Sequence, residues 1–326
     1  MLRAAGLKGL LMLGIAAAGF AAPVHASDSY PSKPIRIVIG FAPGGNTDIF
    51  GRLFATHLQK NLGQPVIVEN RPGAATMLAA QHVATSPPDG YTICLCVTNV
   101  ATNRFAYAKV PYTMADFAPV ALMFQSVTGL TVPSDSPFDS VRSLVQFARD
   151  NPGKLTYSTT GAGGATHLAG ALFAATADIT AVPVHYKGAA PAAMAILSKE
   201  VDYTFSTITT AQPALRDQRI RMLALAAPRR ASALADVPTM AEVGLPEVVT
   251  SVWYGLLVPA GTPAQVIATL NREVAAFVGD KEINARFVAS GELPRGDLSP
   301  EAFGKFIDED TEHMRKIMEP LNLQLG

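Results

Sequence analysis

Two glycine-rich segments, one in each half of the chain, have the composition of an anion-binding turn. The first reads Pro43-Gly-Gly-Asn-Thr47 and the second reads Gly161-Ala-Gly-Gly-Ala-Thr166. Each joins a strand pattern to a helical pattern, so each would place backbone N–H groups at a helix N-terminus, where the helix dipole favours negative charge. Glycine also lets the backbone approach a ligand closely. A carboxylate between the two turns could be held from both sides without an arginine.

The ligand-binding residues that we predict lie in these turns and at neighbouring strand ends. Asp48 either complements the dipole of the first helical turn or contacts the ligand. His167 either lies at the cleft or serves only the start of its helix. The simpler alternative is that both turns are merely tight connections, but their matching places in two similar halves favour binding. The predicted set is Phe41, Ala42, Gly44, Gly45, Asn46, Thr47, Asp48, Thr98, Thr159, Gly161, Gly163, Thr166, His167 and Ser206.

The sequence lacks the motifs of the common catalytic and cofactor sites. Neither turn continues as Gly-Lys-Ser/Thr, and Thr166 stands where a dinucleotide-binding motif needs its last glycine. No Gly-x-Ser-x-Gly elbow occurs, and the scattered histidines form no His-Glu-x-x-His pair. We therefore predict no catalytic residue, no metal site and no cofactor.

The composition is that of a well-packed globular protein. Charged residues make up 16% of the chain and hydrophobic residues 49%. Lys and Arg together number 26, as do Asp and Glu. The chain therefore lacks the excess of positive charge that a nucleic-acid partner would require.

Cys94 and Cys96 are the only cysteines, and they stand in the apolar strand pattern Ile93-Cys-Leu-Cys-Val97. Alternate residues of a strand point to one face, but the i, i+2 spacing is too stretched for an easy disulfide. We therefore predict that both cysteines are small buried residues rather than a redox site.

The pattern of the first half predicts a parallel sheet with helices on its faces. Strands are predicted at 34–40, 65–69 and 91–97. A helix with its apolar stripe over 49–62 ends at Gly63, and a second helix ends near Thr85.

The same alternation restarts in the second half. Ser140 is the predicted N-cap of a helix over 141–150, and Thr166 begins another helix after the second turn. Two long helices follow near the C-terminus. Thr262 is the predicted N-cap of the first, and the second starts at Ser299-Pro300 and runs to about Met318. We expect the halves to be joined by strands that cross near 128–133 and 250–254. The other elements predicted are strands at 155–159, 182–186, 203–206, 221–226 and 253–259 and a helix at 191–199.

The N-terminus has the features of a secretory signal peptide. Arg3 and Lys8 accompany an apolar run over 9–22, and small residues then stand at the two positions that a signal peptidase reads. We predict export to the periplasm with cleavage after Ala26. The alternative, a membrane anchor, needs roughly 20 apolar residues, and Pro23 interrupts this run.

A series of motifs runs in order over nearly the whole mature chain. The segments are Pro34-Ile-Arg-Ile-Val-Ile39, Phe41-Ala-Pro-Gly-Gly-Asn-Thr-Asp48, Leu62-Gly-Gln-Pro-Val-Ile-Val-Glu-Asn-Arg-Pro-Gly-Ala74, Pro88-Asp-Gly-Tyr-Thr92, Asp116-Phe-Ala-Pro-Val120, Pro152-Gly-Lys-Leu-Thr-Tyr157, His167-Leu-Ala-Gly170, Tyr186-Lys-Gly188, Asp236-Val-Pro-Thr239 and Trp253-Tyr-Gly-Leu-Leu-Val-Pro-Ala-Gly-Thr-Pro263. With them the sequence resembles the Bug receptors, the TctC-like substrate-binding proteins of tripartite tricarboxylate transporters.

The resemblance implies an α/β, two-domain periplasmic-binding-protein (Venus flytrap) fold. Each domain would be a mostly parallel sheet flanked by helices, with two crossover strands as hinge. One domain would comprise 27–130 plus 252–326 and the other 131–251. The resemblance also implies that the loops at 42–47 and 159–167 pinch one carboxylate, largely through backbone groups and ordered water.

The ligand class that the resemblance implies is a di- or tricarboxylic acid, an amino acid, nicotinate or an aromatic acid. The implied partners are this small carboxylate and the membrane permease subunits of a tripartite transporter, and we expect a monomer. Many relatives have an acid where this chain has Ser206, which disfavours a cationic amino acid. Gly164 likewise replaces a hydroxyl residue that is common in relatives, so a water or ligand contact is lost there or supplied by Thr166.

Two other functions fit the same fold. A sensory binding protein would present its ligand to a receptor kinase by the same closure. An exported enzyme acting on a small acid would need a base or nucleophile in the cleft. His167 and Asp48 are the only candidates for that role, and no partner in the sequence completes them.

Overall fold

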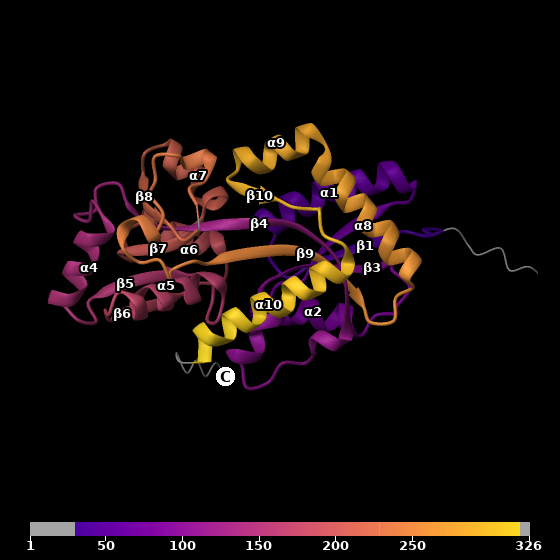
Figure 1. Ribbon diagram of the computed structural model, residues 1–326, viewed down its shortest axis with the longest axis horizontal. Coiled ribbons are helices and arrows are strands. Elements are labelled where there is room, and N and C mark those ends of the chain that lie inside the picture. The colour runs from indigo at the N-terminus through magenta and orange to yellow at the C-terminus, as the bar shows by residue number, and fades with distance from the viewer. Residues whose placement is uncertain (1–29, 228, 320–326) are drawn as a thin grey trace, which may run out of the picture.

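The computed structural model describes residues 30–227 and 229–319. It has two α/β lobes that share one ten-stranded mixed sheet, with helices on its faces (Figure 1). The predicted signal peptide, residues 1–26 with cleavage after Ala26, lies outside the described residues. Within the two described ranges, no helix is long and apolar enough to span a membrane.

The first lobe alternates strands and helices as the sequence pattern predicts. Helix α1 ends at Gly63, which adopts a left-handed φ of 70° that glycine tolerates well. It begins at Asn46, three residues before the predicted apolar stripe, so the first glycine turn leads directly into the helix. The N-terminal elements are β1 (Ile35–Ile39), α1 (Asn46–Leu62), β2 (Val66–Asn70), α2 (Met77–Ala84), β3 (Thr92–Val97), α3 (Asn99–Thr102) and β4 (Phe117–Pro133).

The second lobe repeats the alternation. Ser140 caps α4 as predicted, because its hydroxyl accepts a hydrogen bond from the amide of Ser143. Helix α7 carries Pro213 in its interior, and no predicted element corresponds to it. The elements are α4 (Val141–Asp150), β5 (Leu155–Thr159), α5 (Ala165–Thr176), β6 (Ala181–His185), α6 (Ala189–Leu197), β7 (Tyr203–Thr207), α7 (Ile208–Arg216) and β8 (Ile220–Leu225).

The C-terminal segment returns to the first lobe. Helix α10 begins with Ser299 as N-cap and Pro300 at its first position, as the sequence predicts. In Figure 1 it lies along the first lobe and reaches toward the second. Helix α9 and strand β10 were not predicted. The elements are β9 (Ser251–Pro259), α8 (Ala264–Gly279), α9 (Lys281–Ala289), β10 (Glu292–Pro294) and α10 (Pro300–Met318).

The sheet has the order β2-β1-β3-β9-β4-β7-β5-β6, with β8 and β10 also paired to β4. The pairs β1–β2, β1–β3, β5–β6 and β5–β7 are parallel. The pairs that involve β4 or β9 are antiparallel. Each lobe therefore has its own parallel strands, and the antiparallel strands join the two lobes, which confirms the predicted fold class.

Strand β4 belongs to both lobes. It pairs with β9 up to Val127 and with β7 and β8 from Thr128 onward. The returning chain passes beside this point, because the hydroxyls of Thr128 and Thr250 lie 2.8 Å apart. The predicted domain limits, 27–130 plus 252–326 and 131–251, remain a prediction.

Each lobe has its own buried core. In the first, Phe124 of β4 stacks on Tyr254 of β9 with ring centroids 4.2 Å apart. In the second, Tyr157 stacks on Tyr203 at 5.2 Å. These aromatic pairs and the aliphatic residues around them are buried, and such burial is the main favourable term in folding.

Two local predictions from the sequence are wrong. Cys94 and Cys96 are buried as expected, but they form a disulfide, since their Cα atoms are 5.3 Å apart and both side chains face the same side of β3. Thr262 does not cap α8. Pro263 precedes the helix, and the Thr262 hydroxyl donates instead to the carbonyl of Pro259 at 2.7 Å.

Substitution of Gly255 tests how tightly the centre of β9 is packed. A β-carbon there would lie 2.3 Å from the Phe303 ring and 3.0 Å from the carbonyl oxygen of Ala121. We expect Gly255→Ala to lower the free energy of unfolding by about 1–3 kcal/mol, measured by urea denaturation. Gly279→Ala is the control, because nothing lies within 4 Å of its β-carbon position and alanine favours the helix. Equal stabilities of the two variants would contradict this packing.

Candidate functional site

The first glycine turn is held in shape by Asp48. Its carboxylate accepts hydrogen bonds from the amide of Gly44 at 3.0 Å and from Nδ2 of Asn70 at 3.0 Å. Arg52 pairs with it at 2.9 Å. Burial would raise the pKa of Asp48, but the hydrogen bonds from Arg52, Gly44 and Asn70 lower it below its usual value. Asp48 is therefore ionised, and both of its oxygens have partners within the protein.

The backbone amides that follow this turn have no partner. The first hydrogen bond of the helix runs from the amide of Ile49 to the carbonyl of Gly45 at 2.9 Å. Among the described residues, the amides of Gly45, Asn46, Thr47 and Asp48 donate to no acceptor. They are the positive end of the α1 dipole.

Hydroxyl groups close the second turn from within. The Thr159 hydroxyl accepts from the amide of Gly161 at 3.2 Å and lies 2.7 Å from Nδ1 of His185. The Thr166 hydroxyl accepts from the amide of Thr160 at 2.8 Å. These contacts fix a turn in which Gly161 has a φ of 138°, a value that glycine adopts most readily.

His167 lies against the same turn. The amide of Gly163 donates to its Nδ1 at 3.0 Å, so this nitrogen is unprotonated and Nε2 carries the hydrogen. The ring is buried and lies edge-on to that of His185, with centroids 4.8 Å apart. Burial, together with the charge of His185, lowers the pKa of His167 to about 4. His167 is therefore a neutral support for the turn at physiological pH.

The second turn also presents unpaired amides. The first hydrogen bond of α5 runs from the amide of Leu168 to the carbonyl of Gly164 at 3.0 Å. In the described part of the chain, the amides of Ala162, Ala165, Thr166 and His167 donate to no acceptor. Each turn thus uses part of its amides to hold its own shape and leaves the others at a helix N-terminus.

The second glycine turn contacts the first lobe. The hydroxyl of Tyr107 in the first lobe donates to the carbonyl of Ala162 at 2.8 Å. A β-carbon on Gly164 would lie 4.0 Å from Nδ2 of Asn99, the first residue of α3. Ala165 packs against the core of the first lobe. These contacts bring the second turn against the first lobe.

The remaining predicted residues differ in their surroundings. Thr98 is buried, and its hydroxyl accepts from the amide of Trp253 at 3.1 Å. The Ser206 hydroxyl lies 2.9 Å from that of Thr131 within the sheet. Phe41 is half-buried and Ala42 exposed at the start of the first turn. Thr98 and Ser206 thus have protein partners, as do Asp48, Thr159, Thr166 and His167.

Asn46 is hydrogen-bonded to Glu292, a residue that the sequence did not suggest. Its Nδ2 donates to Oε1 of Glu292 at 2.6 Å and lies 3.4 Å from the hydroxyl of Ser126. Glu292 is only 2% exposed. No motif joins these positions, because they come from α1, β4 and β10, and only the fold brings them together. Ser126 and Asn99 are further buried polar residues that were not in the predicted set.

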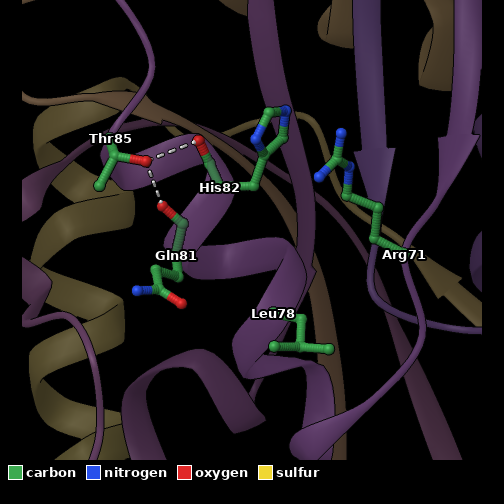
Figure 2. A pocket seen from close by; sticks show the side chains of 5 residues that line it. All are labelled: Arg71, Leu78, Gln81, His82 and Thr85. Carbon is green, nitrogen blue, oxygen red and sulfur yellow. Dashed lines mark hydrogen bonds between the residues drawn. The ribbon is translucent and has the colours of Figure 1, made fainter.

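Two open hollows are found elsewhere on the described surface. One of about 410 Å³ lies between Arg71, just after β2, and helix α2 (Figure 2). Its lining residues are Arg71, Leu78, Gln81, His82 and Thr85. The other, of about 370 Å³, lies beside α8 and contains no residue of either glycine turn. Among the described residues, no group of three His, Cys, Asp or Glu side chains could hold a metal ion.

Comparison with known proteins gives consistent matches over most of the chain. The model of the tripartite tricarboxylate transporter family receptor matches residues 50–323. BugT of Bordetella pertussis is 33% identical over 291 residues, which cover 88% of this chain and 89% of BugT. A UPF0065 protein from the tcbD-tcbE intergenic region of Pseudomonas sp. is 34% identical over 312 residues, 94% of this chain and 93% of that protein.

Solved structures give the same result. A protein of R. palustris with adipate is 31% identical and superposes with a TM-score of 0.86, covering 91% of this chain and 100% of that one. MatC from Rhodopseudomonas palustris with bound malate is 28% identical, with a TM-score of 0.81 over 89% and 100% of the two chains. The periplasmic binding protein BugD is 27% identical, with a TM-score of 0.84 over 91% and 100%.

The pKa of His167 predicts how stability depends on pH. The value is about 4 in the folded protein and 6.5 in a free side chain, so the unfolded state binds the additional proton between these values. Neutral His167 therefore stabilises the folded state above pH 6.5, and this stabilisation is lost as the pH falls toward 4. The comparison variant is His167→Asn, which keeps an acceptor near Gly163. Between pH 6.5 and 4, the free energy of unfolding of the wild type should fall by roughly 2 kcal/mol more than that of this variant. Urea denaturation at several pH values measures this difference.

The matched control is His313→Asn, because His313 is exposed on α10. It should follow the pH dependence of the wild type. A difference between wild type and His167→Asn that stays constant from pH 7.5 to pH 4 would show that His167 titrates normally.

Proposed function

Because the chain belongs to the tripartite tricarboxylate transporter family of receptors, we propose that it binds a small carboxylate between its two lobes in the periplasm and delivers it to the membrane permease of such a transporter. Adipate and malate accompany two of its structural neighbours, and both are dicarboxylates. A di- or tricarboxylate is therefore the ligand class that we favour.

The observation that carries the proposal is the set of unpaired amides at the N-termini of two helices, one in each lobe. Gly45 to Asp48 begin α1, and Ala165 to His167 begin α5. A carboxylate between them would accept several charge-assisted hydrogen bonds, which are stronger than hydrogen bonds between neutral groups. The side chains of Asp48, Thr159, Thr166 and His167 would then act indirectly, because they hold the turns in shape.

Closure would follow from differential binding. A ligand held by amides of both lobes stabilises only the arrangement in which the two turns face each other. The contact between Tyr107 and Ala162 spans the lobes in that arrangement. The closed form is then the form that a permease would recognise.

An enzymatic function receives less support. His167 is neutral and accepts from Gly163, and Asp48 is ionised and paired with Arg52. Neither candidate base is thus available for proton transfer to a ligand. The related proteins and structural neighbours are receptors and binding proteins. A sensory role would use the same closure and differs only in the partner.

Ligand binding should raise the melting temperature of the protein. A ligand that binds only the folded state stabilises it by RT ln(1 + [L]/Kd), about 2.7 kcal/mol at a hundredfold excess over Kd. We would screen adipate, malate, citrate, nicotinate, phthalate and glutamate by thermal shift. We expect dicarboxylates to give the largest shifts. A screen in which no acid shifts the melting temperature would argue strongly against a carboxylate ligand.

Replacing Gly45 tests whether backbone amides bind the carboxylate. Gly45 has a φ of −88°, close to the range of proline, and nothing lies within 4 Å of its β-carbon position. Gly45→Pro removes the amide hydrogen, whereas the control Gly45→Ala keeps it. A hydrogen bond to a charged group contributes about 1.5–3 kcal/mol, so Gly45→Pro should weaken binding roughly 10- to 100-fold by calorimetry. Equal losses in both variants would indicate steric interference instead.

A further inference from the structure

Glu292 is a buried carboxyl group where the two lobes meet. It lies on β10, opposite Ser126 of β4, and is 2% exposed. Its Oε1 accepts from Nδ2 of Asn46 at 2.6 Å, and its Oε2 is hydrogen-bonded to the hydroxyl of Ser126. Asn46 is also the first residue of α1, directly after the glycine turn. The first lobe thus connects Glu292 to the proposed ligand site.

The second lobe reaches the same carboxyl group through Thr209. The hydroxyl of Thr209, a residue of α7, is hydrogen-bonded to Oε1 of Glu292. The same hydroxyl lies 2.8 Å from the carbonyl oxygen of Ser290. This hydroxyl has a single hydrogen. If Glu292 were ionised, that hydrogen would face two acceptors at once. If Glu292 is a neutral acid, its own O–H donates to Thr209, and Thr209 donates to Ser290.

The surroundings of Glu292 also favour the neutral acid. Burial raises its pKa to about 7, although hydrogen bonds from Ser126, Thr209 and Asn46 act in the opposite direction. No lysine, arginine or histidine of the described chain pairs with it. Tyr254 of β9 is its titratable neighbour, and burial raises the pKa of that phenol, so it stays neutral.

The remaining nearby charges have other partners. Arg295, three residues farther along the chain, pairs with Asp297 at 2.9 Å and donates to Gln125 at 2.9 Å. On α1, Asp48 is paired with Arg52. No cation among the described residues therefore compensates the charge that Glu292 would carry if it were ionised.

We propose that Glu292 is a positioning residue that couples proton binding to closure of the lobes. As a neutral acid it links Asn46 of the first glycine turn to Thr209 of the second lobe. When the lobes open, Thr209 leaves and water reaches the carboxyl group, which then ionises at its ordinary pH. The consequence for ligand affinity rests on the proposed function, whereas the protonation of Glu292 does not.

Closure of the lobes should depend on pH, because the open and closed forms bind different numbers of protons. The closed form holds the proton up to a higher pH than the open form, so it binds more protons between pH 4.5 and about 7. Closure is therefore favoured as the pH falls through this range. Above it, the ionised carboxylate is buried without a cation and opposes closure.

The first measurement is made without ligand and again with saturating adipate, because the open and closed forms should titrate differently. Carboxyl ¹³C shifts of the full-length mature protein, labelled at glutamate, are followed from pH 4 to 9. Glu292 is assigned by the resonance that Glu292→Gln lacks. In the closed form we expect a midpoint near pH 7. A midpoint below pH 5 for this resonance in both samples would overturn the proposal.

A pair of variants tests the contribution of the second lobe. Thr209→Val removes the hydroxyl of the second lobe that is hydrogen-bonded to Glu292, so the midpoint of Glu292 should differ from that of the wild type. Thr210→Val is the matched control. The hydroxyl of Thr210 contacts that of Thr207 and is not hydrogen-bonded to Glu292. An equal midpoint in both variants would show that Thr209 does not take part.

The last measurement uses adipate as the probe. The affinity of the wild type, measured by calorimetry, should rise about tenfold or more from pH 8 to pH 5.5, whereas Glu292→Gln should bind with little pH dependence. An equal slope in both proteins would refute the coupling. If adipate does not bind at all, the proposed ligand class fails, and the ¹³C midpoint still decides whether Glu292 holds a proton.

Discussion

Strand β4 passes through both lobes, and the arrangement of the site depends on this continuity. Because it pairs with β9 up to Val127 and with β7 and β8 from Thr128 onward, it fixes how the two parallel sets of strands are oriented. Tyr107 of the first lobe then reaches Ala162, which lies just beyond the carboxyl end of β5. Ligands of open α/β sheets bind beyond such strand ends, and in the proposed site two strand ends contribute.

Different side chains stabilise the backbone of the two glycine turns. Each must hold a glycine-rich backbone in one shape while it leaves some amides unpaired. The first turn uses an ionised acid, Asp48, and the second uses the hydroxyls of Thr159 and Thr166 together with the imidazole of His167. Side chains that resemble ligand contacts in the sequence thus act on the backbone, and the backbone presents the donors. Such preorganisation reduces the entropy that a ligand must overcome on binding.

Burial and hydrogen bonding together determine the charge of Asp48, His167 and Glu292. Asp48 stays ionised, because Arg52 and two neutral donors compensate its partial burial. Burial keeps His167 neutral. Glu292 has hydrogen-bond partners from both lobes but no cation. Of the three groups, only Glu292 has hydrogen-bond partners in both lobes, which is why its protonation state matters for closure.

The sequence by itself predicted most of the elements, the alternation of strands and helices in each half, and the two glycine turns. These features rest on local patterns, such as β-branched runs, the N-cap Ser140 and the left-handed Gly63, which are visible within a few residues. The motif series also predicted the family. The sequence did not reveal α7, where Pro213 interrupts the pattern, or the disulfide of β3, which depends on the distance between two Cα atoms. Tertiary structure alone decided which amides are unpaired and that Asn46, Ser126, Thr209 and Glu292 meet, because these contacts join residues far apart in the chain, and no local pattern encodes such distances.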